Sequence, residues 1–176
     1  MRAPSKALVP TEAGASAHGD RDRAADLRIA ELPVFSLDAT CGTLATGDLN
    51  CRRLLLYFYP KDATPGCTTQ AESFRDLAPD FANAATRIVG VSRDSLVSHR
   101  RFREKHQLPF DLISDTEGEL CRLFDVLREK RLYGRSFEGI VRSSFLFDEV
   151  GLLRKAWRAV KVPGHAQSAL AAVSEL

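Results

Sequence analysis

The chain has 176 residues, of which 44% are apolar, and this suits one domain with a sizeable core. Its formal charge is only +2 and it contains no long basic tract, so charge alone does not favour nucleic acid as a partner. No apolar run approaches the length of a membrane span, and the N-terminus lacks the apolar core of a secretory signal, so we expect a cytoplasmic protein outside the membrane.

Residues 1–26 are rich in Ala, Arg, Ser, Gly, Pro and Asp, and they show no period long enough to bury a face. We interpret them as a disordered tail that precedes one domain at residues 27–176. A transit peptide is the alternative interpretation, but Glu12, Asp20 and Asp22 count against that acid-poor class.

The domain is predicted to begin with a hairpin, followed by a central strand and a helix. Residues 32–37 and 42–44 predict the two hairpin strands, with a turn near residues 38–42. The continuous apolar run 54–59 predicts a strand that is buried on both faces. Turn residues follow, and apolar side chains at helical spacing then predict a helix over residues 68–84.

Strands and helices continue to alternate along the rest of the chain. In order, we expect a strand at 87–92, a helix at 96–106, a strand at 110–113, a short helix at 120–124, a loop rich in Lys, Arg and Gly at 126–139, paired strands at 140–147 and 152–160, and a helix at 164–176. This order predicts an α/β or mixed three-layer fold. We expect His99, His106 and His165 to be surface or capping residues.

Cys67 falls at the first turn of the helix that follows the central strand. The unpaired amides and the dipole at a helix N-terminus favour an anion there, and the thiolate is the nucleophilic form of cysteine. Cys67 is therefore the candidate nucleophile. The alternative is an inert cysteine that is buried as a small hydrophobe.

The residues around Cys67 resemble a known family. Pro60, Thr64 and Cys67 match the P-x-x-x-T-x-x-C pattern of the peroxiredoxins, and residues 57–69 resemble the PrxQ, or bacterioferritin comigratory protein, branch. Further matching segments follow in the expected order at 90–95, 112–115, 139–146 and 160–166, so the resemblance covers roughly residues 30–176. It implies a thioredoxin fold, in which helices flank a central mixed β-sheet, with an N-terminal β-hairpin extension.

The resemblance also implies roles for the matching residues. Cys67 would attack the peroxide, Thr64 would place its hydroxyl beside the sulfur, and Pro60 would stiffen the loop. The amides of Gly66 and Cys67 would bind the substrate, and Arg142 would supply a fixed cation. The plainer alternatives are a helix cap for Thr64 and an exposed strand position for Arg142.

The implied activity is reduction of hydrogen peroxide and small organic hydroperoxides by a thiol peroxidase that uses no cofactor. The chain has no C-x-x-C pair and no Cys/His cluster at metal-ligand spacing, so we expect no metal site. Thioredoxin, glutaredoxin or glutathione would supply electrons. We expect a monomer or weak dimer.

The thiol that completes the cycle is not evident. PrxQ proteins place a resolving cysteine five residues after the peroxidatic one or in the next helix, and this chain has Glu72 and Arg103 there. Cys121 is a possible resolving thiol, although its apolar surroundings favour core packing. Cys41 and Cys51 are the other candidates inside the chain. The simpler interpretation is a one-cysteine mechanism with a thiol from outside.

Two alternative functions remain open. The first is a peroxide-sensing switch that relays oxidation from Cys67 to a partner protein. The second, a thioredoxin-like oxidoreductase, is disfavoured because Thr68 and Thr69 follow Cys67 without a partner cysteine. The basic loop at 128–135 has two interpretations: a docking site for an acidic reductant, or a solvated loop.

Overall fold

The structure is a computed structural model, and it describes residues 29–49 and 52–176. The tail predicted at residues 1–26, the proposed domain boundary at residue 27 and Cys51 all lie outside the described residues. None of the described helices is long and apolar enough to cross a membrane.

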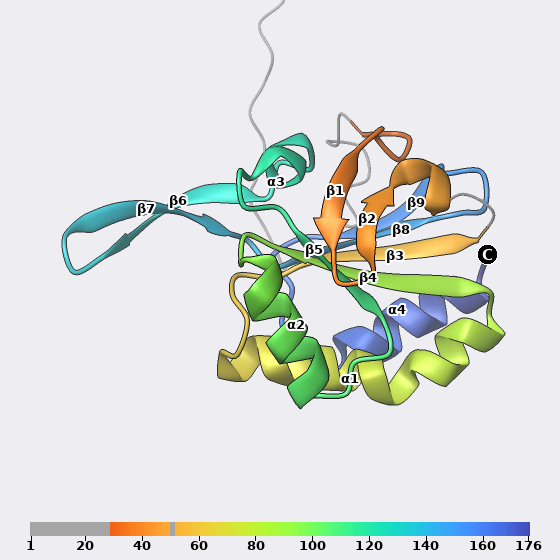
Figure 1. The fold of residues 1–176 in the computed structure, drawn as a ribbon. Helices are drawn as coiled ribbons and strands as arrows, with labels where there is room; N and C mark the ends of the chain where they lie inside the picture. The colour runs from red at the N-terminus through yellow and green to blue at the C-terminus, as the bar shows by residue number, and fades with distance from the viewer. Residues whose placement is uncertain (1–28, 50–51) are drawn as a thin grey trace, which may run out of the picture.

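A seven-stranded mixed sheet forms the centre of the fold, with the strand order β2-β1-β5-β4-β3-β8-β9 (Figure 1). Its strands are β1 (Ser36–Ala39), β2 (Gly42–Ala45), β3 (Arg53–Phe58), β4 (Thr86–Ser92), β5 (Asp111–Ser114), β8 (Ser143–Phe147) and β9 (Leu153–Trp157). Strands β3, β4 and β5 run parallel, whereas β8 pairs antiparallel with β3 and β1 pairs antiparallel with β5. The predicted α/β class with a central mixed sheet is confirmed.

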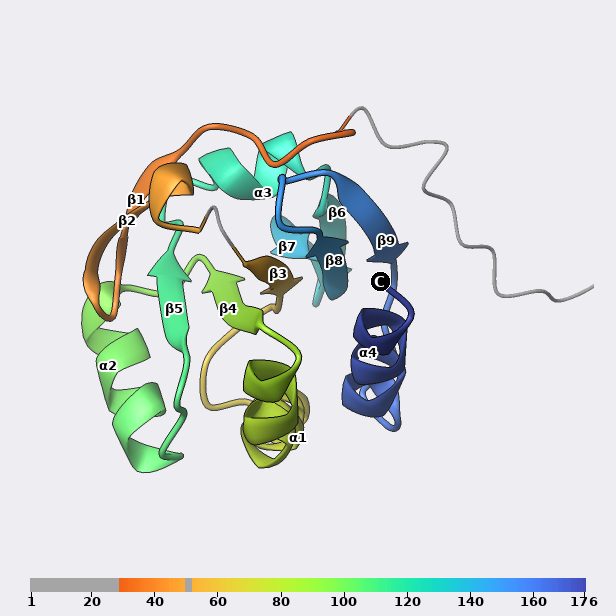
Figure 2. The same ribbon diagram turned by 90° about the vertical axis from the view of Figure 1, so that its right-hand side faces the viewer.

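Helices cover both faces of this sheet. The helices are α1 (Pro65–Asn83), α2 (Leu96–Lys105), α3 (Glu119–Leu123) and α4 (His165–Ser174), with a short 3-10 turn at Thr46–Asp48. Helices α1, α2 and α4 lie along one face, and α3 lies on the other (Figure 2). Each face therefore buries its own apolar cluster.

Strand β3 is buried on both faces, as its unbroken apolar sequence predicts. Leu54, Leu56 and Phe58 point into the cluster on the α3 side, and the alternate residues Leu55 and Tyr57 point into the cluster on the α1 side. Burial of each such side chain contributes about 1.5–3 kcal/mol, so this strand anchors both halves of the core. It also fixes the position of the loop that follows it.

The loop predicted at residues 126–139 is instead a hairpin of β6 (Leu127–Leu132) and β7 (Arg135–Ile140). Residues 131–138 are exposed on both faces, so the apolar/polar alternation that marks a half-buried strand is missing. Its two turn residues, Tyr133 and Gly134, both have positive φ, as a two-residue hairpin turn requires. The sequence Tyr-Gly is a weaker turn signal than Asn-Gly.

The strand predicted at residues 140–147 is interrupted. Ile140 ends β7 and Ser143 begins β8, so Arg142 lies in the connection between two strands and not inside one. The interpretation of Arg142 as a strand residue is wrong in this respect. Its position in a connection lets its side chain turn toward helix α1.

The prediction that the histidines are surface or capping residues is wrong for two of them. The His99 side chain is fully buried, with its ring hydrogen-bonded to Asp62 and to the carbonyl of Ile113. His165 is also buried, and its Nε2 lies 2.8 Å from the Ser144 hydroxyl. A buried imidazole is tolerated when its ring nitrogens have hydrogen-bond partners, as both nitrogens of His99 and Nε2 of His165 do. The spacing of residues in the sequence does not reveal these partners.

Candidate active site

Cys67 is the third residue of α1, as the sequence predicts for the first turn of a helix. The carbonyl of Thr64, the N-cap residue, accepts the Thr68 amide at 2.9 Å, and Pro65 has no amide hydrogen. The Gly66 and Cys67 amides precede the first residue that can bond within the helix. They therefore provide partial positive charge beside the sulfur.

Arg142 places a cation directly against that sulfur. Its Nη2 lies 3.3 Å from Cys67 Sγ, and its Nη1 donates to Oε1 of Gln70, which is one helical turn beyond Cys67. The Arg142 carbonyl in turn accepts the Val160 amide at 2.9 Å. Because both the guanidinium and the backbone are held, the cation has a defined position, as electrostatic stabilisation of a thiolate requires.

The sulfur is buried among apolar side chains. The Cys67 side chain is only 2% exposed and belongs to the apolar cluster that also contains Tyr57. Burial raises the pKa of Tyr57 above its usual range, and the charges of Asp62 and Cys67 act in the same direction, so this hydroxyl stays protonated. Among the described residues, the Tyr57 hydroxyl and the Gln70 Nε2 are buried polar atoms without a hydrogen-bond partner.

Thr64 and Pro60 lie in the loop between β3 and α1, as expected. The Thr64 hydroxyl donates to the Lys61 carbonyl at 3.0 Å and makes no side-chain cap to the helix. Its lone pairs therefore remain as acceptors. Pro60 follows the end of β3 and is exposed.

A buried carboxylate holds this loop from inside, and the sequence analysis missed it. Asp62 accepts from the Tyr59 hydroxyl at 2.7 Å and from Ser98 at 2.7 Å, and its Oδ2 lies 2.8 Å from His99 Nδ1. Its own amide donates to Asp94 at 2.9 Å. Burial acts to raise the pKa of Asp62, but the bonds with His99, Tyr59 and Ser98 outweigh it and hold that pKa below its ordinary value.

Neither of the other described cysteines is placed to reach the sulfur of Cys67. Cys121 is buried in the cluster on the α3 face, opposite the α1 face that holds Cys67, and burial, followed by the Asp115 carboxylate, raises its pKa. Cys41 is exposed in the turn between β1 and β2, beside the start of β5 at Asp111. Cys67 instead follows β3, which lies three strands across the sheet from β1, and at about 4.8 Å per strand this places the two thiols well beyond the reach of a disulfide.

The sequence and the fold both match known proteins. The AhpC/TSA family model matches residues 29–156. The chain is 52% identical over 120 residues to Peroxiredoxin Bcp of Xanthomonas campestris pv. campestris, which covers 68% of this chain and 75% of that protein. It is 46% identical over 134 residues to Peroxiredoxin Bcp of Bacillus subtilis, which covers 76% and 85%.

A solved structure of Xanthomonas campestris Peroxiredoxin Q superposes with a TM-score of 0.76 at 45% identity, covering 80% of this chain and 90% of that one. The matched region includes β3, the loop after it and α1, where the candidate nucleophile lies. The chain therefore belongs to the AhpC/TSA family, as a peroxiredoxin of the PrxQ or Bcp type, and it is a thiol peroxidase.

Proposed function

We propose that Cys67 is the peroxidatic cysteine of a cytoplasmic peroxidase that reduces hydrogen peroxide and small organic hydroperoxides, and that a thiol from outside the chain regenerates it. The observation that carries this proposal is the 3.3 Å contact between Arg142 Nη2 and Cys67 Sγ at the N-terminus of α1. Cys41, Cys67 and Cys121 are all free thiols, which is the usual state in a reducing compartment.

In the proposed step, the Cys67 thiolate attacks one peroxide oxygen and the O–O bond breaks. The sulfur is oxidised to a sulfenic acid, and the leaving hydroxide or alkoxide takes a proton to become water or an alcohol. The Arg142 guanidinium and the Gly66 and Cys67 amides would stabilise the charge that moves onto the leaving oxygen. The Thr64 lone pairs would accept the hydrogen of the bound peroxide.

Organic hydroperoxides are included because the sulfur lies within an apolar cluster. A solved structure of the Xanthomonas campestris bacterioferritin comigratory protein, 44% identical to this chain, is described in terms of alkyl peroxide reduction. We therefore expect small alkyl hydroperoxides to be substrates of this chain as well.

Thioredoxin, glutaredoxin or glutathione is the proposed source of electrons. The positions at which PrxQ proteins carry a resolving cysteine hold Glu72 and Arg103. Cys121 lies on the opposite face of the sheet, and Cys41 lies beside β1, three strands from β3, so neither is placed to form a disulfide with Cys67, whose Cα atom must come within about 7 Å of its partner's. An external thiol avoids any unfolding of the core.

The test is the mass of the reduced protein after one equivalent of hydrogen peroxide, with free thiols alkylated and the peptides mapped. We expect one oxygen, or a trapped sulfenic adduct, on Cys67, and no reaction in Cys67→Ser. A disulfide from Cys67 to Cys121, Cys41 or Cys51 would contradict the one-cysteine cycle. Full peroxide consumption by Cys67→Ser would refute the site.

Sustained turnover separates an enzyme from a peroxide-sensing switch. With excess peroxide and a reducing system of thioredoxin, glutaredoxin or glutathione, we expect many cycles per protein. A chain that reacts once and then stalls would support the switch instead.

A further inference from the structure

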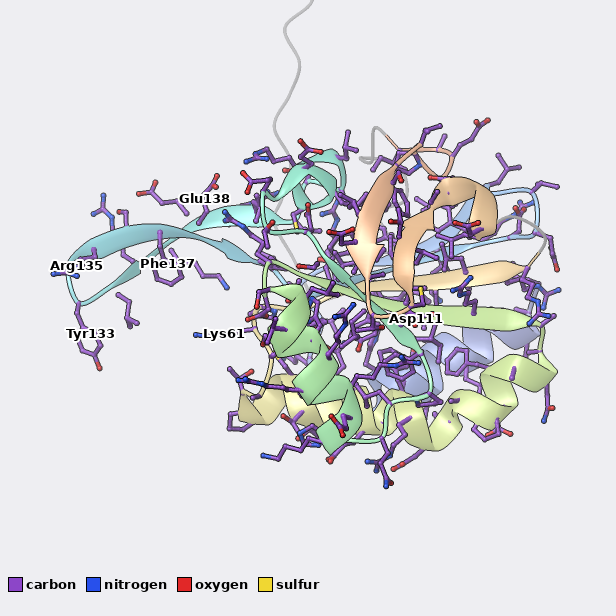
Figure 3. The ribbon with its side chains drawn as sticks, in the orientation of Figure 1. Lys61, Asp111, Tyr133, Arg135, Phe137 and Glu138 are labelled. Carbon is purple, nitrogen blue, oxygen red and sulfur yellow. The ribbon has the colours of Figure 1, made fainter. Side chains whose placement is uncertain are left out.

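The β6–β7 hairpin projects from the body of the molecule (Figure 1). Its outer part carries exposed apolar side chains, among them Tyr133 and Phe137 (Figure 3). Leu132 is 57% exposed, Tyr133 96% and Phe137 47%. Tyr133 has φ 49°, a left-handed conformation that costs a residue with a side chain about 1–2 kcal/mol. The Tyr133 ring, at 96% exposure, recovers almost none of that cost by packing against the rest of the chain.

The two faces of the hairpin differ in charge. The register pairs Leu132 with Arg135 and Lys130 with Phe137, so these four side chains share one face, which we call the cationic face. On the opposite face the register pairs Glu129 with Glu138 and Arg131 with Ser136. The cationic face contains no acidic residue. Arg128, opposite Gly139 on the same face, pairs with Asp125 at 2.7 Å, and Lys130 Nζ donates to the Ile140 carbonyl at 3.0 Å. Arg135 is therefore the charge of this face without a partner among the described residues.

The cationic face lies within reach of a protein that reacts with Cys67. Strand β7 ends at Ile140, two residues before Arg142. At about 3.3 Å per residue, Phe137 lies about 10 Å and Arg135 about 17 Å along the strand from Ile140. A typical protein interface buries about 800 Å² on each partner, which is a disc about 16 Å in radius. Ile140 is itself two residues, about 7 Å, from Arg142, whose guanidinium contacts Cys67 Sγ. A disc centred on Cys67 therefore covers the base of the hairpin, and a partner whose reactive thiol lies off the centre of its interface extends along the hairpin to Phe137 and Arg135.

The rim of the active-site loop carries the same kind of surface. Pro60, Lys61, Ala63 and Pro65 are exposed, whereas the acidic residue of this loop, Asp62, is buried. Lys61 and the hairpin lie at the same edge of the molecule (Figure 3). The rim and the hairpin thus present apolar groups with positive charge.

We propose that the β6–β7 hairpin is a docking arm for the protein that reduces Cys67, a dithiol protein with acidic side chains around its reactive thiol. Its carboxylates would face Arg135 and Lys61, and its apolar surface would cover Phe137 and Tyr133. This inference rests on the proposed function. A second copy of this chain is disfavoured as the occupant, because two cationic faces repel each other.

The docked reaction has two steps. A partner thiolate attacks the sulfenic sulfur of Cys67, forms a mixed disulfide and, with one proton, releases water. The second thiolate of the same partner then attacks the partner's sulfur in the mixed disulfide. This releases the Cys67 thiolate and leaves the partner oxidised with an internal disulfide. Two electrons pass from the partner to Cys67.

The test compares Arg135→Glu with Arg131→Glu. The two substitutions change the net charge equally at exposed positions, but they lie on opposite faces of the hairpin. For each variant we would measure the rate of Cys67 oxidation by hydrogen peroxide, kcat/KM for a bacterial thioredoxin with an acidic surface, and turnover with dithiothreitol. We expect Arg135→Glu to lower kcat/KM for thioredoxin about tenfold, with a smaller loss at high salt, and Arg131→Glu to leave it nearly unchanged. Both should keep the peroxide and dithiothreitol rates.

Several results would overturn the docking arm. They are equal effects of the two substitutions, no effect of Arg135→Glu, or a wild-type protein that turns over with dithiothreitol or glutathione but with no protein dithiol. A wild-type Cys67 that does not react with peroxide would instead refute the proposed function. Phe137→Ser supplies an uncharged second variant, for which we expect a thioredoxin-specific loss that salt does not relieve.

Discussion

The buried pair of Asp62 and His99 provides the sharpest test of how the active-site loop is held. We predict that His99→Phe, which keeps the ring volume but removes both nitrogens, strongly destabilises the fold. The Asp62 carboxylate then stays buried with only the hydroxyls of Tyr59 and Ser98 as partners. It loses the contact at 2.8 Å with His99 Nδ1.

The expected size of this effect follows from the geometry. Removing one partner of a buried pair lowers the free energy of unfolding by about 3–5 kcal/mol. Because two hydroxyl donors remain on Asp62, we expect a loss of about 3 kcal/mol for His99→Phe. Asp62→Asn in the same chain removes the stranded charge. The double variant should therefore lose less unfolding free energy than the two single variants together, and we expect a coupling energy between the two positions of about 2 kcal/mol.

The assay is urea unfolding of the four proteins at pH 7, with the rate of Cys67 oxidation measured alongside. His106→Phe is the control. His106 is the C-cap residue of α2 and pairs at 3.1 Å with the partly exposed Glu72, and such pairs contribute at most about 1 kcal/mol. A loss below about 1 kcal/mol for His99→Phe, or strictly additive losses in the cycle, would refute this account of the loop.

The same pair gives a sign for acid sensitivity. The pKa of Asp62 is lower in the folded state than its ordinary value of 3.8. Its contribution to stability is therefore complete above that value and is lost as pH falls through the lower folded pKa. In Asp62→Asn the loss of unfolding free energy that protonation of Asp62 causes at low pH should be absent, which urea unfolding at a series of pH values would measure.

Three further predictions concern other parts of the structure. Gly90→Ala should cost about 1–3 kcal/mol in urea unfolding, because a Cβ would lie 2.8 Å from Tyr57 Cζ and 2.7 Å from a Leu112 methyl, whereas Gly47→Ala meets nothing within 4 Å and should be near neutral. Burial, followed by the charge of Arg142, lowers the pKa of His165 to about 4. Between pH 4 and 6.5 the His165 side chain is therefore protonated more fully in the unfolded chain than in the folded one, and the free energy of unfolding should rise by about 3 kcal/mol over this range. If the free energy of unfolding of His165→Asn depends on pH as steeply as that of the wild type, this account is wrong. Arg142→Ala should slow peroxide oxidation of Cys67 tenfold or more without unfolding the protein, and an unaltered second-order rate would remove Arg142 from the site.

Much of the fold is predictable because its core elements carry strong local patterns. The unbroken apolar run of β3 reflects burial by two helical layers, and the helical spacing after residue 67 places Cys67 in the first turn of α1. The contact between Arg142 and the sulfur joins residues 75 positions apart, so only the resemblance to a family pointed to it.

The features that the sequence does not reveal depend on long-range partners or on exposure. His99 is buried because Asp62 and the Ile113 carbonyl meet it from two other elements. The β6–β7 hairpin has no buried face, so it leaves no alternating pattern. Both cases show that side-chain periodicity reports burial against a core and little else.

The order in which the chain is synthesised bears on when its chemistry begins. Cys67 leaves the ribosome 75 residues before Arg142, and β3 lacks its neighbour β8 until that same late segment appears. At about 5–20 residues per second, the thiol exists for roughly 4–15 s without its cation. The peroxidatic role proposed for Cys67 therefore requires the finished chain, and we expect reactivity toward peroxide to begin only after residue 142 has been synthesised.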